Sequence, residues 1–248
     1  MKKIYFFLLA LFAFASCAKE VSIPQNATPV KEVAGIYPDY RDITIPPNIA
    51  PLNFQVTAKG DNFVGVIQGQ GVQLVAGGNE DGKLFLDSTE WRKLLTANKG
   101  RDLSVELYAE RNGQWVSFPK YVIHVAKEPI DKYLSYRLIE PSYELYRQLG
   151  IYQRNLENFE QTPIYENNRT FDEKENHCIN CHNYQAYDTK RMLFHVRAIH
   201  GGTMLIENGK IEKLNMKTDS TLANTVYPTW HPTRNWVVFS SNKTGQAF

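Results

Sequence analysis

The sequence predicts a mainly β protein in which two strand-rich regions flank a short helical segment. Between residues 43 and 127, short runs rich in Val, Phe, Leu and Tyr are separated by clusters of Gly, Asn and Asp. From 128 to 160 the apolar residues recur at helical spacings, and after residue 203 extended apolar runs return. The 248 residues, of which 43% are hydrophobic and 22% charged, have the composition of a folded globular protein.

The first sixteen residues have the form of an export signal. Lys2 and Lys3 precede an apolar run over 4–14, which is about half of the roughly 20 residues that a membrane-spanning helix needs. Residues 14–17, Phe-Ala-Ser-Cys, resemble the lipobox of bacterial lipoproteins, although Phe14 stands where Leu is usual. The resemblance implies that residues 1–16 are removed and that Cys17 becomes the lipidated first residue. The alternative is ordinary signal-peptidase cleavage, which would leave Cys17 as an incidental thiol.

The segment 17–42 is predicted to be the lipidated N-terminus and a flexible tether. Pro24, Asn26 and Pro29 interrupt it, and large apolar side chains are few in its first half. A lipidated cysteine carries several acyl chains, which is enough for stable anchoring in a membrane. We therefore expect the protein to be held at the membrane through Cys17.

Six extended segments and one helix are predicted in the first folded region. Asn112-Gly113 lies between two strand-like runs and predicts a type I′ hairpin, because both central residues of that turn need positive φ. The helix is expected over 88–97, with Ser88 as its N-cap. Six strands favour an immunoglobulin-like β-sandwich over 43–127, in which His124 is a packed or surface histidine. The extended segments cover 53–58, 62–69, 71–76, 83–87, 103–111 and 121–126.

Residues 128–202 are predicted to form a short helical segment. Pro129 and Pro141 are placed as helix starters and Gly150 as a stop, which predicts two short helices over 128–160. The aromatic and aliphatic residues at helical spacing are expected to be core rather than the wall of a cofactor site. They are Tyr133, Leu134, Leu138, Tyr143, Leu145, Tyr146, Leu149 and Tyr152.

The most informative motif is Cys178-Ile179-Asn180-Cys181-His182. Cys-x-x-Cys-His has the form of a c-type haem attachment site. Two thiols at this spacing reach the two vinyl groups along one edge of a porphyrin, and the adjacent histidine reaches the iron. We therefore predict one covalent haem c on Cys178 and Cys181, with His182 as the proximal iron ligand. The predicted export and this motif support each other, because covalent haem attachment and Cys-x-x-Cys-His occur together.

Three other uses of the two thiols are less favoured. A thioredoxin-like dithiol needs a βαβ context, which the flanking sequence does not offer. A tetrahedral zinc site needs a second ligand pair, and the six consecutive residues 177–182 can hardly surround one ion. A disulfide between Cys178 and Cys181 is compatible with an oxidising compartment, but closing so short a loop stabilises little.

The distal ligand decides what the haem does. A second histidine gives a low reduction potential, a methionine a higher one, and an open position permits ligand binding or peroxide chemistry. We expect His195 as the distal ligand, because it lies in an extended apolar segment after an ordinary loop, with Met192 as the alternative. Arg197 is a candidate partner for a haem propionate or a solvated side chain. The less favoured candidates for the distal position are His177, His200 and Met204.

The segment after residue 203 is predicted to be β again. Asn208-Gly209 predicts a hairpin between 203–207 and 210–215. Residues 227–242 are similar to the WD-like propeller blades of the TolB type, whose motif is Pro-x-Trp-Ser-Pro-Asp-Gly followed by an apolar strand ending in Phe-Ser. The match departs from that motif at His231 and at Thr233-Arg234, which leaves His231 open as a ligand or a turn residue. The residues that match the motif are Pro228, Trp230, Pro232, Trp236, Val238, Phe239 and Ser240.

The order of these parts resembles the exported TolB-like lipoproteins of Bacteroidetes that carry a Cys-x-x-Cys-His site and a propeller. The resemblance implies that 203–248 holds the first propeller blade. A propeller needs at least about four blades to close, so we expect the sequence to be a fragment of a longer protein. The resemblance is strongest from His177 to Asn242.

The predicted function is that of a membrane-anchored monohaem c-type cytochrome that transfers electrons or senses redox state in an envelope complex. We expect an outer-membrane lipoprotein, on the periplasmic or cell-surface face, with a redox or scaffold protein as partner. Without residues 1–16 the chain has 26 basic and 26 acidic residues, so nucleic acid is not expected to bind. One alternative is a binding or scaffold lipoprotein with structural haem or a Cys178–Cys181 disulfide. A haem peroxidase is the less favoured alternative, which leaves enzymatic activity open.

Overall fold

The computed structural model describes residues 21–139, 149–169, 172, 174 and 178–241. The described chain is mainly β, as predicted, and it divides into two compact units, Met1–Pro129 and Ile130–Phe248. Among the described residues there is one α-helix, and it is too short to cross a membrane. The signal peptide and Cys17 lie outside the described residues.

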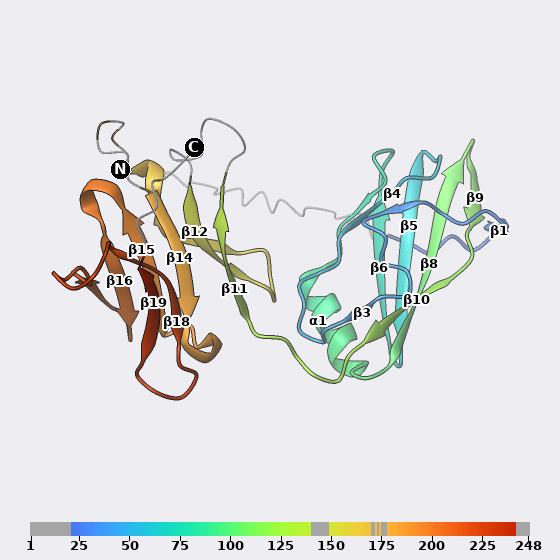
Figure 1. The fold of residues 1–248 in the computed structure, drawn as a ribbon. Helices are drawn as coiled ribbons and strands as arrows, with labels where there is room; N and C mark the ends of the chain where they lie inside the picture. The colour runs from blue at the N-terminus through green and yellow to red at the C-terminus, as the bar shows by residue number, and fades with distance from the viewer. Residues whose placement is uncertain (1–20, 140–148, 170–171, 173, 175–177, 242–248) are drawn as a thin grey trace, which may run out of the picture. The chain divides into compact units, whose positions relative to one another are not determined.

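A seven-stranded sheet forms the larger layer of the first unit. β8 lies at its centre, pairing with β5 along one edge and with both β9 and β10 along the other (Figure 1). The two-residue strands β1 and β3 extend it in parallel pairs. The strands are β1 (Thr28–Pro29), β3 (Thr44–Ile45), β5 (Asn62–Gly69), β6 (Val72–Gly78), β8 (Asp102–Arg111), β9 (Gln114–Ser117) and β10 (Tyr121–Val125).

A smaller sheet of three strands packs on the same apolar core. It consists of β2 (Ile36–Tyr37), β4 (Phe54–Val56) and β7 (Lys83–Leu84). Phe54 and Leu84 from this sheet share one buried cluster with Val105 and Leu107 from the seven-stranded sheet. The first unit is therefore two sheets around one core, as burial of the alternating apolar residues requires.

The strands β1 and β2 correct the predicted tether. Thr28 and Pro29 pair with Val116 and Ser117, and Ile36 is buried in the core. Residues 21–42 are thus part of the first unit and not a free linker. The prediction was wrong because strands of two residues show no alternation that a sequence pattern could reveal.

The helix α1 spans Ser88–Ala97, which confirms the predicted bounds. Its N-cap is Asp87 rather than Ser88, because the Asp87 carboxylate accepts hydrogen bonds from the backbone N–H groups of Thr89 and Glu90. Trp91 on its buried face donates its indole N–H to the carbonyl of Ile49. The predicted hairpin after β8 is also confirmed, since Asn112 has φ 51° and Gly113 φ 75°.

The described residues of the second unit form three antiparallel sheets in chain order. Each sheet is a meander, in which consecutive strands are neighbours. The first holds β11 (Tyr133–Leu138), β12 (Gly150–Asn155) and β13 (Gln161–Glu166). The second holds β14 (Cys178–Tyr184), β15 (Arg191–Arg197), β16 (Gly202–Glu207) and β17 (Lys210–Leu214), and the third holds β18 (Thr225–Trp230) and β19 (Val237–Ser241).

Two predictions for this unit were wrong. The segment from 128 to 202 is not helical in its described part, because it forms β11 to β15 with only three short 3₁₀ turns (Asn167–Arg169, Gln185–Tyr187 and Ala198–His200). The spacing of Tyr133, Leu134 and Leu138 is compatible with a helix. However, residues 133–138 pair with 150–155, and this pairing stabilises strands instead. The predicted boundary at 203 falls within one sheet, since β16 pairs with β15. Residues 140–148, which held part of the second predicted helix, lie outside the described residues.

The second sheet of this unit is covered on both faces. One face contacts the first sheet through an apolar cluster that includes Ile151, Ile179, Met192 and Phe194. The other face contacts the β18–β19 hairpin, where the Asn183 side chain accepts a hydrogen bond from the backbone of Trp230 (Figure 1). Residues of β15 therefore alternate between an apolar environment and the side of the third sheet.

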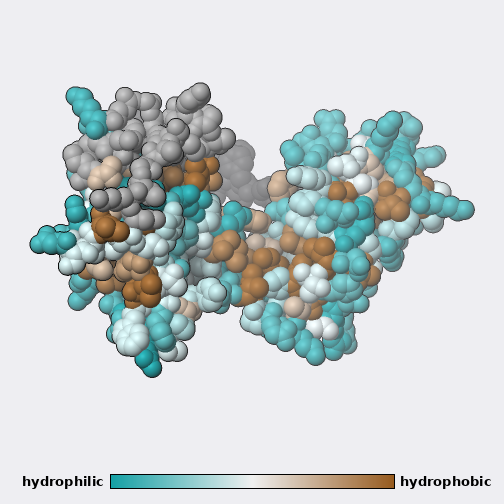
Figure 2. Space-filling view, viewed as in Figure 1, coloured by the Kyte–Doolittle hydropathy of each residue, from teal (hydrophilic) through white to brown (hydrophobic). Residues whose placement is uncertain are grey.

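Some large apolar side chains are exposed in both units. Figure 2 shows hydrophobic residues on the surface of each unit, in separate patches among hydrophilic ones. On the β18–β19 hairpin and its connecting turn, Trp236 and Val238 are 60% and 72% exposed. This face of the hairpin is not covered by described residues.

His124 provides a pH-dependent contact in the first unit. Its Nδ1 lies 2.7 Å from Asp102 Oδ1 and its Nε2 2.9 Å from Asp42 Oδ1, so both ring nitrogens donate when the imidazole is protonated. The hydrogen bonds with Asp42 and with Asp102 raise the pKa of His124 above its ordinary value. This contribution to stability is fully present below the ordinary histidine pKa and is lost as pH rises through the folded-state pKa.

We predict that His124→Gln lowers the free energy of unfolding more at about pH 5.5 than at about pH 8.5. Urea unfolding of both proteins at the two pH values measures the difference. The control is Lys120→Gln. Lys120 is an exposed residue directly before β10, and its replacement changes a charge without contact with Asp42 or Asp102. Equal effects of His124→Gln at both pH values would contradict the protonated contact.

Candidate functional site

The Cys-x-x-Cys-His motif lies on β14, an edge strand of its sheet. Asn180 pairs with His195 and Asn183 with Leu193, so Cys181 and His182 together oppose one residue of β15. This is a β-bulge, and Cys181 within it has a positive φ of 57°. The motif is therefore extended and bulged, whereas the prediction placed it in a helical segment.

The two thiols have different surroundings. Cys178 is 6% exposed and belongs to the apolar cluster with Ile151 and Met192. Cys181 is half-buried, and its Sγ lies 4.0 Å from Nη2 of Arg197. Neither forms a disulfide among the described residues. Arg197, a predicted partner for a propionate, is thus placed beside the second thiol.

His182 is half-buried and oriented by the neighbouring sheet. Burial lowers the pKa of His182 from its ordinary value, although a hydrogen bond to the backbone of Ser135 on β11 opposes that shift. The lowered pKa keeps the imidazole neutral at pH 7, which is the form that ligates a metal. Next to it, the Ser135 hydroxyl lies 2.6 Å from the hydroxyl of Tyr184. Tyr184 therefore helps to fix the strand on which His182 lies.

The structure separates His195 from His182. Met192, Phe194 and Val196 on β15 face the apolar cluster. His195 lies between Phe194 and Val196 and therefore faces the opposite side of the sheet. His195 is 3% exposed, and its Nδ1 lies 3.4 Å from the hydroxyl of Thr203 on β16. His182 contacts Ser135 on the cluster side. The two histidines therefore do not face each other across a common space.

The other predicted distal ligands have separate positions. Met192 is 2% exposed within the cluster that also holds Cys178, on the side of the sheet towards β11. Met204 is half-buried against the same cluster. His200 is exposed in the 3₁₀ turn Ala198–His200, and His177 lies outside the described residues.

The donor set of Cys178, Cys181 and His182 fits a c-type haem in its chemistry. The thiols carry no other covalent bond among the described residues. Burial lowers the pKa of His182, and its ring is hydrogen-bonded to the backbone of Ser135, as metal-bound histidines are usually held by a second partner. A thiol that bonds to haem must be reachable, whereas the Cys178 thiol is buried in the apolar cluster.

Sequence reasoning missed the junction between the second and third sheets, which centres on Arg191. Its guanidinium carbon lies 4.5 Å from the ring centroid of Trp230. Nη1 donates to Gln185 Oε1 and to Asn235 Oδ1, both at 2.6 Å, and Nε lies 3.0 Å from Glu207 Oε1. These partners are spread over fifty residues, so no local pattern in the sequence marks the junction.

His231 is a turn residue in this junction. Its Nδ1 accepts hydrogen bonds from the backbone N–H groups of Thr233 and Arg234, at 3.2 and 3.1 Å. Its ring packs edge-on against Trp236. The side chain of Gln185 donates to the carbonyls of His231 and Arg234, which ties the turn to the second sheet. His231 thus performs the role of a capping side chain where the TolB-type motif has Ser.

Comparisons with known proteins do not assign the chain. No family model matches the sequence. No curated protein shows significant similarity to it either.

We predict that Arg191→Lys lowers the free energy of unfolding by about 2 kcal/mol, because Lys cannot keep both the planar contact with Trp230 and the hydrogen bonds to two amides. Urea unfolding, followed by tryptophan fluorescence, measures the loss. Lys190→Ala next to it is the control, since that side chain is exposed. A loss below about 0.5 kcal/mol, within the range of ordinary surface substitutions, would show that the junction contributes little.

Proposed function

We propose that the protein is an exported, lipid-anchored monohaem c-type cytochrome that transfers electrons or senses redox state in an envelope complex. The observation that carries the proposal is the Cys-x-x-Cys-His sequence on an edge strand, with both thiols unpaired and the pKa of the histidine lowered by burial. Cys178 and Cys181 would hold the group through thioether bonds, and His182 would ligate the iron. A bound haem would supply the one-electron couple.

The burial of Cys178 constrains the order of maturation. In each thioether bond a thiol adds to a vinyl group, so that sulfur bonds to carbon and its proton goes to the neighbouring carbon. The thiol must therefore be reachable, and Cys178 is 6% exposed in the packed unit. In the proposal, attachment precedes the packing of β14, and the apolar cluster would then pack around the attached group while the bulge presents His182 next to Ser135.

The arrangement favours Met192 over His195 as the second axial ligand. Met192 lies on the side of the sheet that His182 faces, whereas His195 faces the opposite side. A methionine ligand gives a higher reduction potential than a second histidine. The proposal therefore prefers Met192 to His195 as an iron ligand, which reverses the preference drawn from the sequence. It follows that the protein would be an electron carrier of higher reduction potential.

We also infer the finer architecture from the way the sheets are arranged. Three consecutive meanders that stack face to face are the pattern of successive propeller blades, and the segment similar to TolB-type blades forms β18 and β19. In this proposal β11–β13 is the first blade, and the motif lies on the first strand of the second. The first unit is an immunoglobulin-like sandwich, and the blades form the surface that docks an envelope partner.

The buried thiol also favours a second candidate function. If Cys178 stays in the cluster, the protein is a binding or scaffold lipoprotein in which the haem is absent and the stacked sheets dock a partner. Both candidates place the protein at the outer membrane through a lipid on Cys17. They differ only in whether the thiols carry haem.

We predict that protein matured in an exporting host with cytochrome c assembly machinery shows the pyridine haemochrome spectrum of thioether-linked haem. Cys178→Ala together with Cys181→Ala removes the covalent haem. Cys17→Ala is the matched control, because it abolishes the membrane anchor and leaves the haem spectrum unchanged. Wild-type protein without a c-type α-band would overturn the cytochrome proposal and leave the scaffold function.

We further predict that Met192→Leu shifts the oxidised spectrum from low spin towards high spin, because it removes the second axial ligand while conserving volume. His195→Gln is expected to leave the spin state unchanged. The Soret and charge-transfer bands report the result. A shift caused by His195→Gln alone would contradict the placement of His195 away from the haem.

A further inference from the structure

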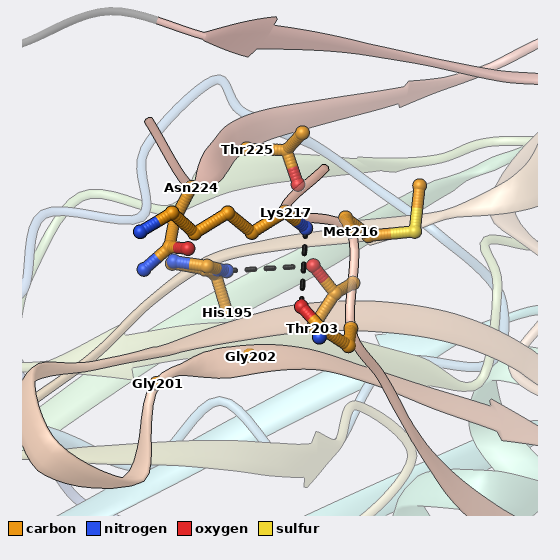
Figure 3. Close-up of a pocket in the computed structure, with 9 residues that line it drawn as sticks. His195, Gly201, Gly202, Thr203, Met216, Lys217, Asn224 and Thr225 are labelled. Carbon is orange, nitrogen blue, oxygen red and sulfur yellow. Dashed lines mark hydrogen bonds between the residues drawn. The ribbon is translucent and has the colours of Figure 1, made fainter. Parts of the chain in front are cut away.

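A small polar cavity lies on the side of the second sheet opposite to the apolar cluster that holds Cys178. His195, Thr203 and Thr225 form its buried floor, and the exposed Lys217 and Asn224 stand at its rim. Figure 3 shows the Lys217 side chain extending past the imidazole of His195 towards Asn224. The cavity measures about 20 Å³, which is room for one or two water-sized groups and far too little for a haem.

The floor of the cavity has unused hydrogen-bonding capacity. Thr203 and His195 are 1% and 3% exposed, and the one contact between them is a long one, 3.4 Å from Nδ1 to Oγ1. Thr225 is 8% exposed, and its hydroxyl has no hydrogen-bond partner among the described residues. Figure 3 shows that hydroxyl turned towards the cavity. Buried polar groups are normally paired, so this arrangement indicates that a polar ligand completes the floor.

The charges around the cavity select the kind of ligand. None of the described residues that line it is acidic, and Lys217 brings a positive charge to the rim. Arg197 adds a positive charge near His195, since it acts with burial to lower the pKa of that imidazole. The lining side chains can all donate hydrogen bonds except for Met216. An anionic group with acceptor oxygens matches this environment better than a cation does.

We propose that this cavity binds one small oxyanion, specifically a carboxylate group. A carboxylate has two acceptor oxygens and occupies about the space of two water molecules. One oxygen would accept from the Thr225 hydroxyl and the His195 ring, and the other from Lys217 at the rim. The proposal is independent of the haem, because its residues lie on the opposite face of the sheet from His182.

The test uses the full chain with isotope-labelled histidine side chains. Acetate is titrated at constant ionic strength, and the imidazole resonances of His195 are followed by NMR. Acetamide, which is neutral and of the same shape, is the matched control. Saturable shifts of His195 with acetate and none with acetamide support the site. No shift with acetate would show that the cavity holds water only, and equal shifts with both compounds would show that it does not select an anion; either result overturns the proposal.

Two variants separate the site from a general effect of surface charge. Lys217→Gln is expected to weaken acetate binding about tenfold, whereas Lys210→Gln, at the start of β17 and outside the cavity lining, leaves it unchanged. Thr225→Val removes the hydroxyl at nearly constant volume and is expected to weaken binding several-fold without lowering the stability of the apo protein, because the hydroxyl has no protein partner to lose. Equal effects of the two lysine variants, or full affinity in Thr225→Val, would overturn the proposal.

Discussion

The bulge at Cys181 and His182 is the constraint on which the rest of the site depends. Ile179 pairs with Val196 and Tyr184 with Met192, and all four belong to the same apolar cluster. In a regular strand, residues five positions apart point to opposite faces, so Ile179 and Tyr184 reach one cluster only because the bulge inserts a residue between them. The bulge places Cys181, a non-glycine residue, at a positive φ, which is an unfavourable backbone conformation. Backbone strain of this kind is often found at functional sites.

A second set of contacts holds the other side of the sheet in place. Arg191 and Gln185 connect β14 and β15 to the turn between β18 and β19, through Trp230 and the backbone of His231. The second sheet is therefore fixed between an apolar cluster on one face and a polar junction on the other. This separation places Cys178 and Met192 in a dry environment, while His195 lies at a small polar cavity.

The sequence predicted the features that depend on local patterns. The bounds of β5 and α1 and the Asn112-Gly113 turn follow from alternation, capping and turn residues close together in the chain. In place of the helices expected over 128–160, the described residues form β11 and β12, because cross-strand pairing overrode an apolar spacing that was compatible with both helix and strand. The motif itself was visible, but the face to which His195 points was not, since it depends on the register of β14 with β15.

The central claim is that one haem is bound covalently at Cys178 and Cys181. The most direct measurement is mass spectrometry of the peptide that contains residues 178–182, digested from protein exported and matured with cytochrome c assembly machinery. The proposal predicts that this peptide carries the mass of one haem and resists removal of the group by acid extraction. A peptide with two unmodified thiols, or with a Cys178–Cys181 disulfide, would contradict it.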